Sequence, residues 1–339
     1  MFGYYKGTDG NTVITGFKND VVPAGEYTEE NPLVFPSSIN GSPVTKIADY
    51  AFNQDADGDK TKETSKYTGY ANITAITLPD TLKTIGLHSM TGFKNLAKIE
   101  IPDSVELIDD YAFAYIYNTE AHTPKSIKFG SSLKTIGSSA FYSCGYLCTI
   151  KELVIPASVE TIESSAFVLC HALDVIFEGA PSVGAYVFRN QIKLENVVCL
   201  NENIVFGDKA FGLDGTQGNE STVTDGFTVV GAASVYDKVK ASNAAAGFPA
   251  EDVAKVTYAD NYVYKTASVP AVYYWGTDSD AKLIKAKYNS DASKLESCSV
   301  VSMTAGNSYP LELASEEGAV KNFVWTMGDC KPLNKSVNY

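Results

Sequence analysis

A short unit of alternating apolar and polar residues recurs along the first two thirds of the chain. In LAKIEIP, residues 96–102, Ile99 and Ile101 alternate with Lys98 and Glu100. This alternation predicts a short strand with one buried and one solvent-facing side. Pro102 lacks the N–H that a strand ladder needs, so it ends the strand.

The unit then returns through a second apolar run. In SVELIDDYAF, residues 104–113, Val105 and Ile108 are expected to point to the interior. Small Ala112 lets the chain return closely, and Phe113 fills the centre. A single unit leaves its apolar face open. Stacking successive units, with their strands in a parallel ladder about 4.8 Å apart, closes that face into one continuous core.

About seven copies of the unit follow one another, at steps of 21 to 38 residues. The steps without obvious insertions fit the period of about 20–29 residues that is typical of leucine-rich repeats. The copies are marked by a Phe or its substitute at Phe52, Met90, Phe113, Phe141, Phe167, Phe188 and Phe211.

The repeat IKELVIPASVETIESSAFVLCHAL, residues 150–173, resembles the BspA-like leucine-rich repeats of bacterial surface and secreted proteins. The resemblance covers roughly residues 33–211, and the opening NTVITGFKNDVV is similar to the N-terminal cap of that family. It implies a right-handed solenoid that is usually exported and for which interaction or adhesion is commonly assumed.

The predicted fold class is an α/β-type leucine-rich repeat solenoid, mostly β with a short 3-10 or irregular convex side, followed by an all-β immunoglobulin-like sandwich. Residues 1–32 form an N-terminal β cap, and residues 33–225 hold the repeats. In residues 226–254, Ser234 and Asp237 have capping-box spacing and indicate a short helix that covers the last repeat. Strand-like runs such as AVKNFVWTM predict the sandwich over residues 255–339.

Charge and cysteine content exclude several classes of partner. The net charge of −13 repels phosphate backbones and anionic membrane surfaces, so no nucleic-acid partner is expected. We expect no membrane span, because no run of eighteen apolar residues occurs. The segment MFGYYKGTDG lacks the features of a signal peptide, which we presume to have been removed. The six cysteines make neither a disulfide scaffold nor a zinc array.

Asp55, Asp57 and Asp59 copy the first three ligand positions of a calcium loop. The copy fails at the sixth position, where Gly is replaced by Lys60, and at the twelfth, where Glu is replaced by Lys66. A solvated acidic turn is the favoured interpretation, and weak calcium binding is the alternative.

Catalysis is not indicated. The chain has only His88, His122 and His171, none in a catalytic motif, and the repeat pattern predicts that His88 and His171 lie on the surface. No nucleophile elbow, phosphate loop or dinucleotide fingerprint occurs, so we expect no enzyme and no cofactor. Two carboxylates would suffice for a glycosidase, which leaves that activity open.

Two pairs of cysteines have related positions. Cys144 and Cys170 each follow the repeat Phe by three residues, and buried thiols are favoured over a bridge because parallel side chains point alongside each other. Cys298 and Cys330, both in the last domain, are a separate candidate disulfide.

Two surfaces are candidates for binding. The solvent-facing strand positions are expected to form a concave face with Ala75, Thr77, Lys98, Glu100, Ser126, Lys128, Glu152, Val154, Asp174 and Ile176. Insertions at residues 53–72 and 114–124 share a phase and would bring Tyr67, Tyr70, Tyr115, Tyr117 and His122 to one edge. The alternatives are that the concave face only keeps the protein soluble, and that the insertions are surface loops whose length has no function.

The leading hypothesis is an exported bacterial binding or adhesion protein whose partner is a protein or glycan on a cell surface. An accessory carbohydrate-binding protein, or a fragment of a carbohydrate-active surface protein, is the alternative, motivated by Trp275 and Trp325. Core packing is the other interpretation of both tryptophans. A cytoplasmic scaffold is a third hypothesis.

Overall fold

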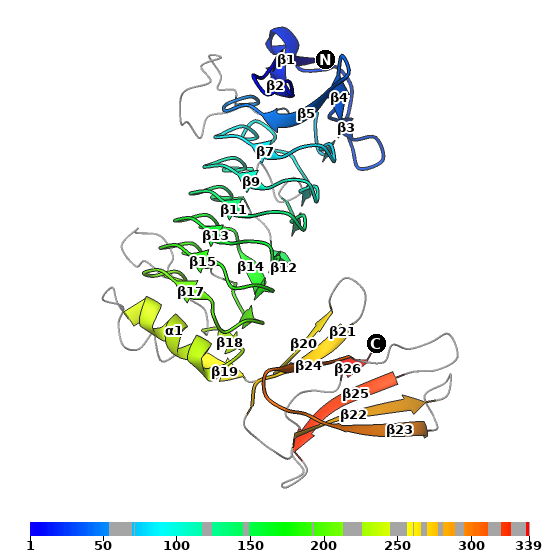
Figure 1. Ribbon diagram of the computed structural model, residues 1–339, viewed down its shortest axis with the longest axis vertical. Helices are drawn as coiled ribbons and strands as arrows, with labels where there is room; N and C mark the ends of the chain where they lie inside the picture. Colours follow the sequence, from blue (N-terminus) through cyan, green and yellow to red (C-terminus); the bar gives the residue numbers. More distant parts are fainter. Residues whose placement is uncertain are drawn as a thin grey trace. The chain divides into compact units, whose positions relative to one another are not determined.

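The computed structural model describes most of the chain (Figure 1). The described residues are 1–53, 70, 72–116, 124–144, 149–191, 193–212, 226–244, 256–259, 261–265, 270–276, 281–288, 295–310, 320–326 and 337–338. They form two compact units. The first comprises residues 1–227 and 238–256, and the second residues 228–237 and 257–339.

The first unit begins with an antiparallel hairpin. Strand β1 (Phe2–Lys6) pairs with β2 (Thr12–Phe17), and the 3-10 helix η1 (Lys18–Asp20) follows. Strand β2 then pairs in parallel with β5 (Ser42–Ile47), which also carries the short antiparallel strand β4 (Ser38–Ile39). The ring of Phe17 packs edge-on against Phe52 at 5.0 Å, so the hairpin closes the apolar end of the repeats.

Two ladders of parallel strands run through the repeats (Figure 1). The first ladder consists of β3 (Leu33–Val34), β6 (Ile76–Thr77), β8 (Ile99–Glu100), β10 (Ile127–Lys128), β12 (Ile150–Ile155), β14 (Ala172–Phe177) and β16 (Asn196–Cys199), paired as β3–β6, β8–β10 and β12–β14–β16. The second ladder consists of β5, β7 (Thr84–Ile85), β9 (Leu107–Ile108), β11 (Thr135–Ile136), β13 (Thr161–Ile162), β15 (Ser182–Val183) and β17 (Val205–Phe206). The first ladder contains the predicted strands, and the second was not predicted.

The repeat phenylalanines stack in the centre of the first unit. The rings of Phe113, Phe141 and Phe167 are fully buried and follow one another at 5.2 Å, with interplanar angles of 4° and 6°. Phe188 and Phe211 continue the column at 5.3 and 5.2 Å. The ring spacing therefore matches the spacing of strands in a ladder, as the stacked-unit prediction requires.

A left-handed residue stands two positions before each repeat Phe or Met90. These residues have φ between 50° and 61°, and they are Tyr50, His88, Tyr111, Ser139, Ser165, Tyr186 and Lys209. Their backbone N–H groups bond to the next coil, as in Ser139 N–H to Ser164 O at 3.0 Å. This side of the coils is therefore a ladder of hydrogen-bonded turns, and η1 is the only 3-10 helix among the described residues. Strain at each left-handed position is offset by these shared turns.

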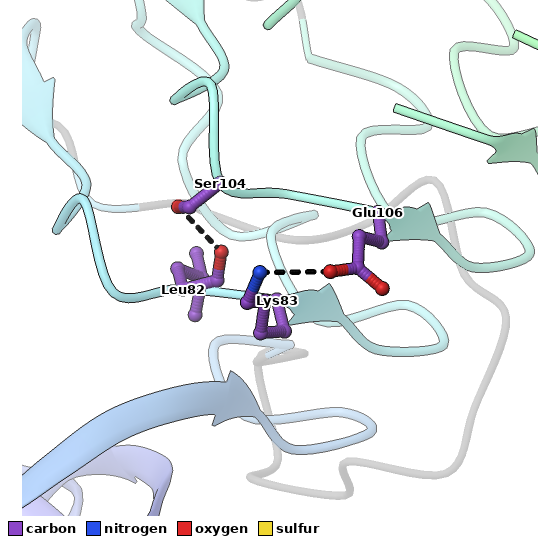
Figure 2. A network of polar contacts seen from close by, with 4 residues as sticks. All are labelled: Leu82, Lys83, Ser104 and Glu106. Carbon is purple, nitrogen blue, oxygen red and sulfur yellow. Dashed lines mark hydrogen bonds and ion pairs between the residues drawn. The ribbon is translucent and has the colours of Figure 1, made fainter. Parts of the chain in front are cut away.

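Alternating charges line the solvent side of the second ladder. Lys83 Nζ lies 2.7 Å from Glu106 Oε1, and Lys134 Nζ lies 2.9 Å from Glu160 Oε1. Figure 2 shows the first pair beside the hydrogen bond from Ser104 Oγ to Leu82 O, at 2.7 Å. All four charged side chains are more than half exposed. Such pairs contribute little stability, but like charges in the same register would repel.

The last coil is closed by helix α1 (Ala233–Ala244), close to the helix expected there. Ser242 takes the place of a further coil, because its carbonyl accepts from Lys209 N–H at 3.0 Å. Its hydroxyl accepts from Ala210 N–H at 3.2 Å and donates to Gly207 O at 2.6 Å.

The second unit is mainly antiparallel sheet. It contains β18 (Thr228–Val230) paired in parallel with β19 (Thr257–Ala259), a three-stranded sheet of β20 (Asn261–Lys265), β21 (Pro270–Tyr274) and β24 (Asn307–Pro310), and a four-stranded sheet of β23 (Leu295–Ser302), β22 (Ala281–Tyr288), β25 (Val320–Thr326) and β26 (Val337–Asn338). Tyr274, Ala281, Leu283 and Met303 form a buried cluster there. The all-β content is as expected, and the immunoglobulin-like sandwich and the domain limits stay predictions.

A test of coil packing lies at Gly130, which occupies the place that Pro79, Pro102 and Pro156 have in other coils. A Cβ on Gly130 would overlap the Pro102 carbonyl and lie 2.6 Å from Asp103 Cα. Since these are backbone atoms, Gly130→Ala should lower the free energy of unfolding by about 1–3 kcal/mol. Urea denaturation measures the change. Ser131→Ala, at an exposed neighbour, is the control, and equal stability of both variants would contradict the packing.

Candidate binding surface

The outward side chains of the first ladder form the candidate surface, which we call the ladder face. Because side chains alternate along a strand, one position per strand points out between two buried ones. The structure exposes Thr77, Glu100, Lys128 and Glu152, and it half-buries Lys98 and Val154. All six residues proposed for this face from the sequence are therefore at least partly accessible.

Charge is unevenly distributed along the ladder face. Lys98 Nζ lies 3.5 Å from Glu100 Oε1 on the same strand, and Glu100 is in register with Lys128 on the next. Further along, Glu152 is in register with Asp174, which places two carboxylates on adjacent strands. Like charges opposite each other are unfavourable. The ladder face therefore runs from a mixed pair of charges to an acidic pair.

A hydrogen bond from the neighbouring strand supports the acidic pair. Asn196 Nδ2 donates to Asp174 Oδ1 at 2.7 Å from the neighbouring strand β16. This bond fixes the Asp174 carboxylate, whereas Glu152 is exposed at the adjacent strand. A cationic group from outside could contact both carboxylates at once.

Two positions expected on this face are buried instead. Ala75 is 3% exposed and Ile176 is fully buried. Ile176 stands in register between Val154 and Val198, so three coils carry a continuous aliphatic column. The expectation that Ala75 and Ile176 face solvent is wrong, because the side chains of Val154 and Val198 flank Ile176 and the backbone of Ala75 is hydrogen-bonded to Tyr27 and Leu33 of the preceding coil.

The inserted loops give a mixed result. Tyr70 is only 4% exposed and packs edge-on against Phe17 at 5.1 Å and Phe93 at 5.2 Å, so its place on a binding edge is wrong. The chain has returned to the core by this residue. Tyr115 is half-buried, 5.4 Å from the Tyr142 ring of the next coil. Tyr67, Tyr117 and His122 lie outside the described residues.

The calcium candidate Asp55, Asp57 and Asp59 also lies outside the described residues and stays a prediction. Within the part of the chain that the structure describes, no three His, Cys, Asp or Glu side chains come together as metal ligands would.

Both described histidines are buried, contrary to the surface positions expected for them. His88 is 5% exposed because its ring lies between Tyr50 at 5.4 Å and Tyr111 at 4.6 Å. These three residues occupy successive left-handed positions. The sequence analysis did not predict this stack, although the three residues share one repeat position, two before Phe52, Met90 and Phe113.

His171 is 2% exposed at another left-handed position, with φ of 49°. Burial, assisted by the positive charge of Lys193, lowers the pKa of His171 to about 4. The imidazole is therefore neutral at pH 7, and the Ile150 N–H bonds to the His171 carbonyl at 3.1 Å. This environment describes a core histidine rather than a base beside a nucleophile.

The three described cysteines of the repeats are core residues. Cys144 and Cys170 are fully buried thiols, as expected, and Cys199 is buried as well. Burial raises the pKa of the Cys199 thiol, which disfavours the reactive thiolate. Cys298 is exposed, and because Cys330 lies outside the described residues their pairing stays a prediction.

In the second unit, the Trp275 side chain is half-buried, while the side chain of Trp325 is not described. Among the described residues, no helix combines the length and apolar character that crossing a bilayer requires.

Comparison with known proteins agrees with the repeat pattern. A family model described as a BspA type Leucine rich repeat region matches in six copies, over residues 61–147 and 119–215. A search of curated proteins and a search of solved structures each found no match.

The buried state of His171 predicts a specific pH dependence. The unfolded histidine protonates near pH 6.5, whereas the folded one resists protonation until about pH 4. Its stabilising contribution is thus complete above pH 6.5 and is lost as the pH falls toward 4.

His171→Asn keeps a residue that tolerates the left-handed backbone and removes the titration. Between pH 7.5 and pH 4.5, the unmodified chain should lose about 2–3 kcal/mol more unfolding free energy than the variant. Urea titrations at both pH values measure this difference. An identical loss in the two proteins would show that His171 is accessible to protons in the folded state.

Proposed function

Because the chain belongs to the BspA-type leucine-rich repeat family, we propose that it is an exported, non-enzymatic bacterial binding protein. Its ladder face contacts a protein partner on a cell surface. The family assignment supports a binding scaffold, since stacked repeats offer an extended, rigid surface. Export rests on the family resemblance alone.

The acidic pair Glu152 and Asp174 is the observation that carries this proposal. The two carboxylates are in register on adjacent hydrogen-bonded strands, so the backbone that carries them is already ordered before a partner binds. A Lys or Arg side chain of the partner would form charge-assisted hydrogen bonds with these carboxylates. The partner surface that fits is therefore basic at this point.

The neighbouring Lys98, Glu100 and Lys128 define the register of the partner. Lys98 and Glu100 already form an ion pair, and Lys128 is exposed beside Glu100. A second carboxylate from the partner would meet Lys128 while its basic group meets Glu152. Complementary charges of this kind affect specificity and association rate more than affinity.

An accessory carbohydrate-binding role is the second candidate. The half-buried Trp275 ring at the end of β21 is the observation in its favour, because partly exposed aromatic rings stack on sugars. A shift of tryptophan fluorescence with polysaccharide that Trp275→Phe abolishes would support this role. Unchanged fluorescence across a polysaccharide panel would reject it.

A charge reversal on the ladder face tests the leading proposal. The full chain is applied to an array of purified extracellular proteins and glycans, and each ligand found is titrated against Glu152→Lys. Loss of the acidic pair should weaken the protein ligand by about tenfold or more, which corresponds to about 1.4 kcal/mol.

Glu163→Lys is the matched control. Glu163 is an exposed glutamate on the same coil as Glu152, but it follows the second-ladder strand β13 rather than lying on the ladder face. The affinity of this variant should equal that of the unmodified chain. An array with no protein ligand, or equal weakening by both variants, would contradict the proposal.

A further inference from the structure

Within the described part of the chain, the second ladder ends at β17 with an acceptor that receives no hydrogen bond. In every earlier coil, the carbonyl of the last residue of the second-ladder strand accepts an N–H from the following coil. The bonds run from Gly86 to Ile47, Asp109 to Ile85, Gly137 to Ile108, Glu163 to Ile136, Gly184 to Ile162 and Gly207 to Val183, at 2.7 to 3.0 Å. Phe206 is the next member of the series. Among the described residues, β17 pairs with β15 alone and nothing donates to the Phe206 carbonyl.

Helix α1 replaces the missing coil on both sides of Phe206 but not at Phe206 itself. On one side, Lys238 Nζ donates to Ile204 O at 3.2 Å and to Glu202 O at 2.5 Å. On the other side, the Ser242 hydroxyl donates to Gly207 O. The end of the ladder is thus capped at residues 204 and 207 and open between them.

A pocket of about 320 Å³ lies at this opening. It is lined by Val205, Phe206, Asp208, Lys238, Ala241 and Ser242. Its lining is mainly apolar, and Val205 is 57% exposed, an unusual position for an aliphatic side chain at the end of a core. The Asp208 side chain is exposed at the same place.

We infer that this opening is a strand-addition site for an extended, basic peptide segment of a partner protein. A backbone N–H of the peptide donates to the Phe206 carbonyl and continues the ladder, as in other cases of β-augmentation. An apolar side chain of the peptide packs between Val205 and Ala241, and the following Lys or Arg approaches Asp208.

Charge favours a basic peptide. The chain has a net charge of −13, so its field attracts cationic segments, and Asp208 gives that attraction a local target. The ammonium of Lys238 is held by two backbone carbonyls and is directed into the cap. The site belongs to the second ladder, so it is independent of the ladder face and of the function proposed for it.

The test uses the full chain and a blocked peptide that alternates valine and lysine. Amide chemical shifts in ¹H–¹⁵N spectra should change at Val205, Phe206, Gly207 and Ala241. A peptide that alternates valine and glutamate should bind about tenfold more weakly or worse, because it meets Asp208 and the overall negative field. N-methylation of the peptide backbone should weaken binding to a similar extent, about tenfold, because it removes the donor to Phe206.

Two variants separate the pocket from unspecific attraction. Ala241 is exposed, so Ala241→Trp fills the pocket without entering the core and should abolish the shifts. Asp208→Asn keeps the shape of the pocket and should reduce the preference for lysine over glutamate. Ala24→Trp, at an exposed alanine of the N-terminal segment, is the control and should bind as the unmodified chain does.

Three outcomes would overturn the inference. They are shifts spread over the acidic surface rather than centred on Phe206, unchanged affinity of the N-methylated peptide, and unchanged affinity of Ala241→Trp. If the ladder face binds no ligand but the peptide still shifts the amide signals around Phe206, the proposed function is rejected and the strand-addition site is supported.

Discussion

The column of stacked phenylalanine rings is the constraint on which the repeat unit depends. From Phe113 to Phe211, five rings follow one another at 5.2 to 5.3 Å with interplanar angles below 10°. This spacing sets the rise of each coil, and it is close to the separation of hydrogen-bonded strands. The rings, the two strand ladders and the turns therefore repeat with one common step. A coil with a different rise would break the contact of its ring and its hydrogen bonds together.

The surfaces follow from this common step. Because each coil repeats the last, a residue type at one position forms a line of side chains across the unit. The lines hold the alternating Lys83, Glu106, Lys134 and Glu160, the acidic pair Glu152 and Asp174, and the aromatic stack around His88. The same regularity leaves backbone groups without a following coil at the two ends of the repeats, where other elements must cover them. The hairpin β1–β2 closes one end, while α1 closes the other end except, as far as the described residues go, at Phe206.

The repeat, its central Phe and the first ladder could be predicted from the sequence because apolar residues recur at the same positions in each copy. The second ladder was missed because each of its strands after β5 has only two residues, as in Thr135–Ile136, too short for alternation to be visible. The burial of His88 and His171 was missed for a different reason. His88 stands two residues before Met90, at a position that holds Tyr, Ser or Lys in the other coils, so its residue type gives no sign of burial. His171 stands at a different left-handed position, four residues after Phe167, where the repeat pattern gives no sign of burial either. The burial of Tyr70 was missed because this residue follows an insertion, and the sequence pattern does not show at which residue the chain returns to the core.

The most direct test of the account is the removal of one complete coil. Deletion of residues 142–167 joins Phe141 to Val168 and removes one strand from each ladder together with one ring of the column. Because each coil contacts only its neighbours, the shortened chain should fold, and its crystal structure should show the Phe141 ring stacked on Phe188 at the spacing of the other coils. A chain that aggregates or loses cooperative unfolding after this deletion would contradict the claim that the stacked rings and ladders form one repeating core.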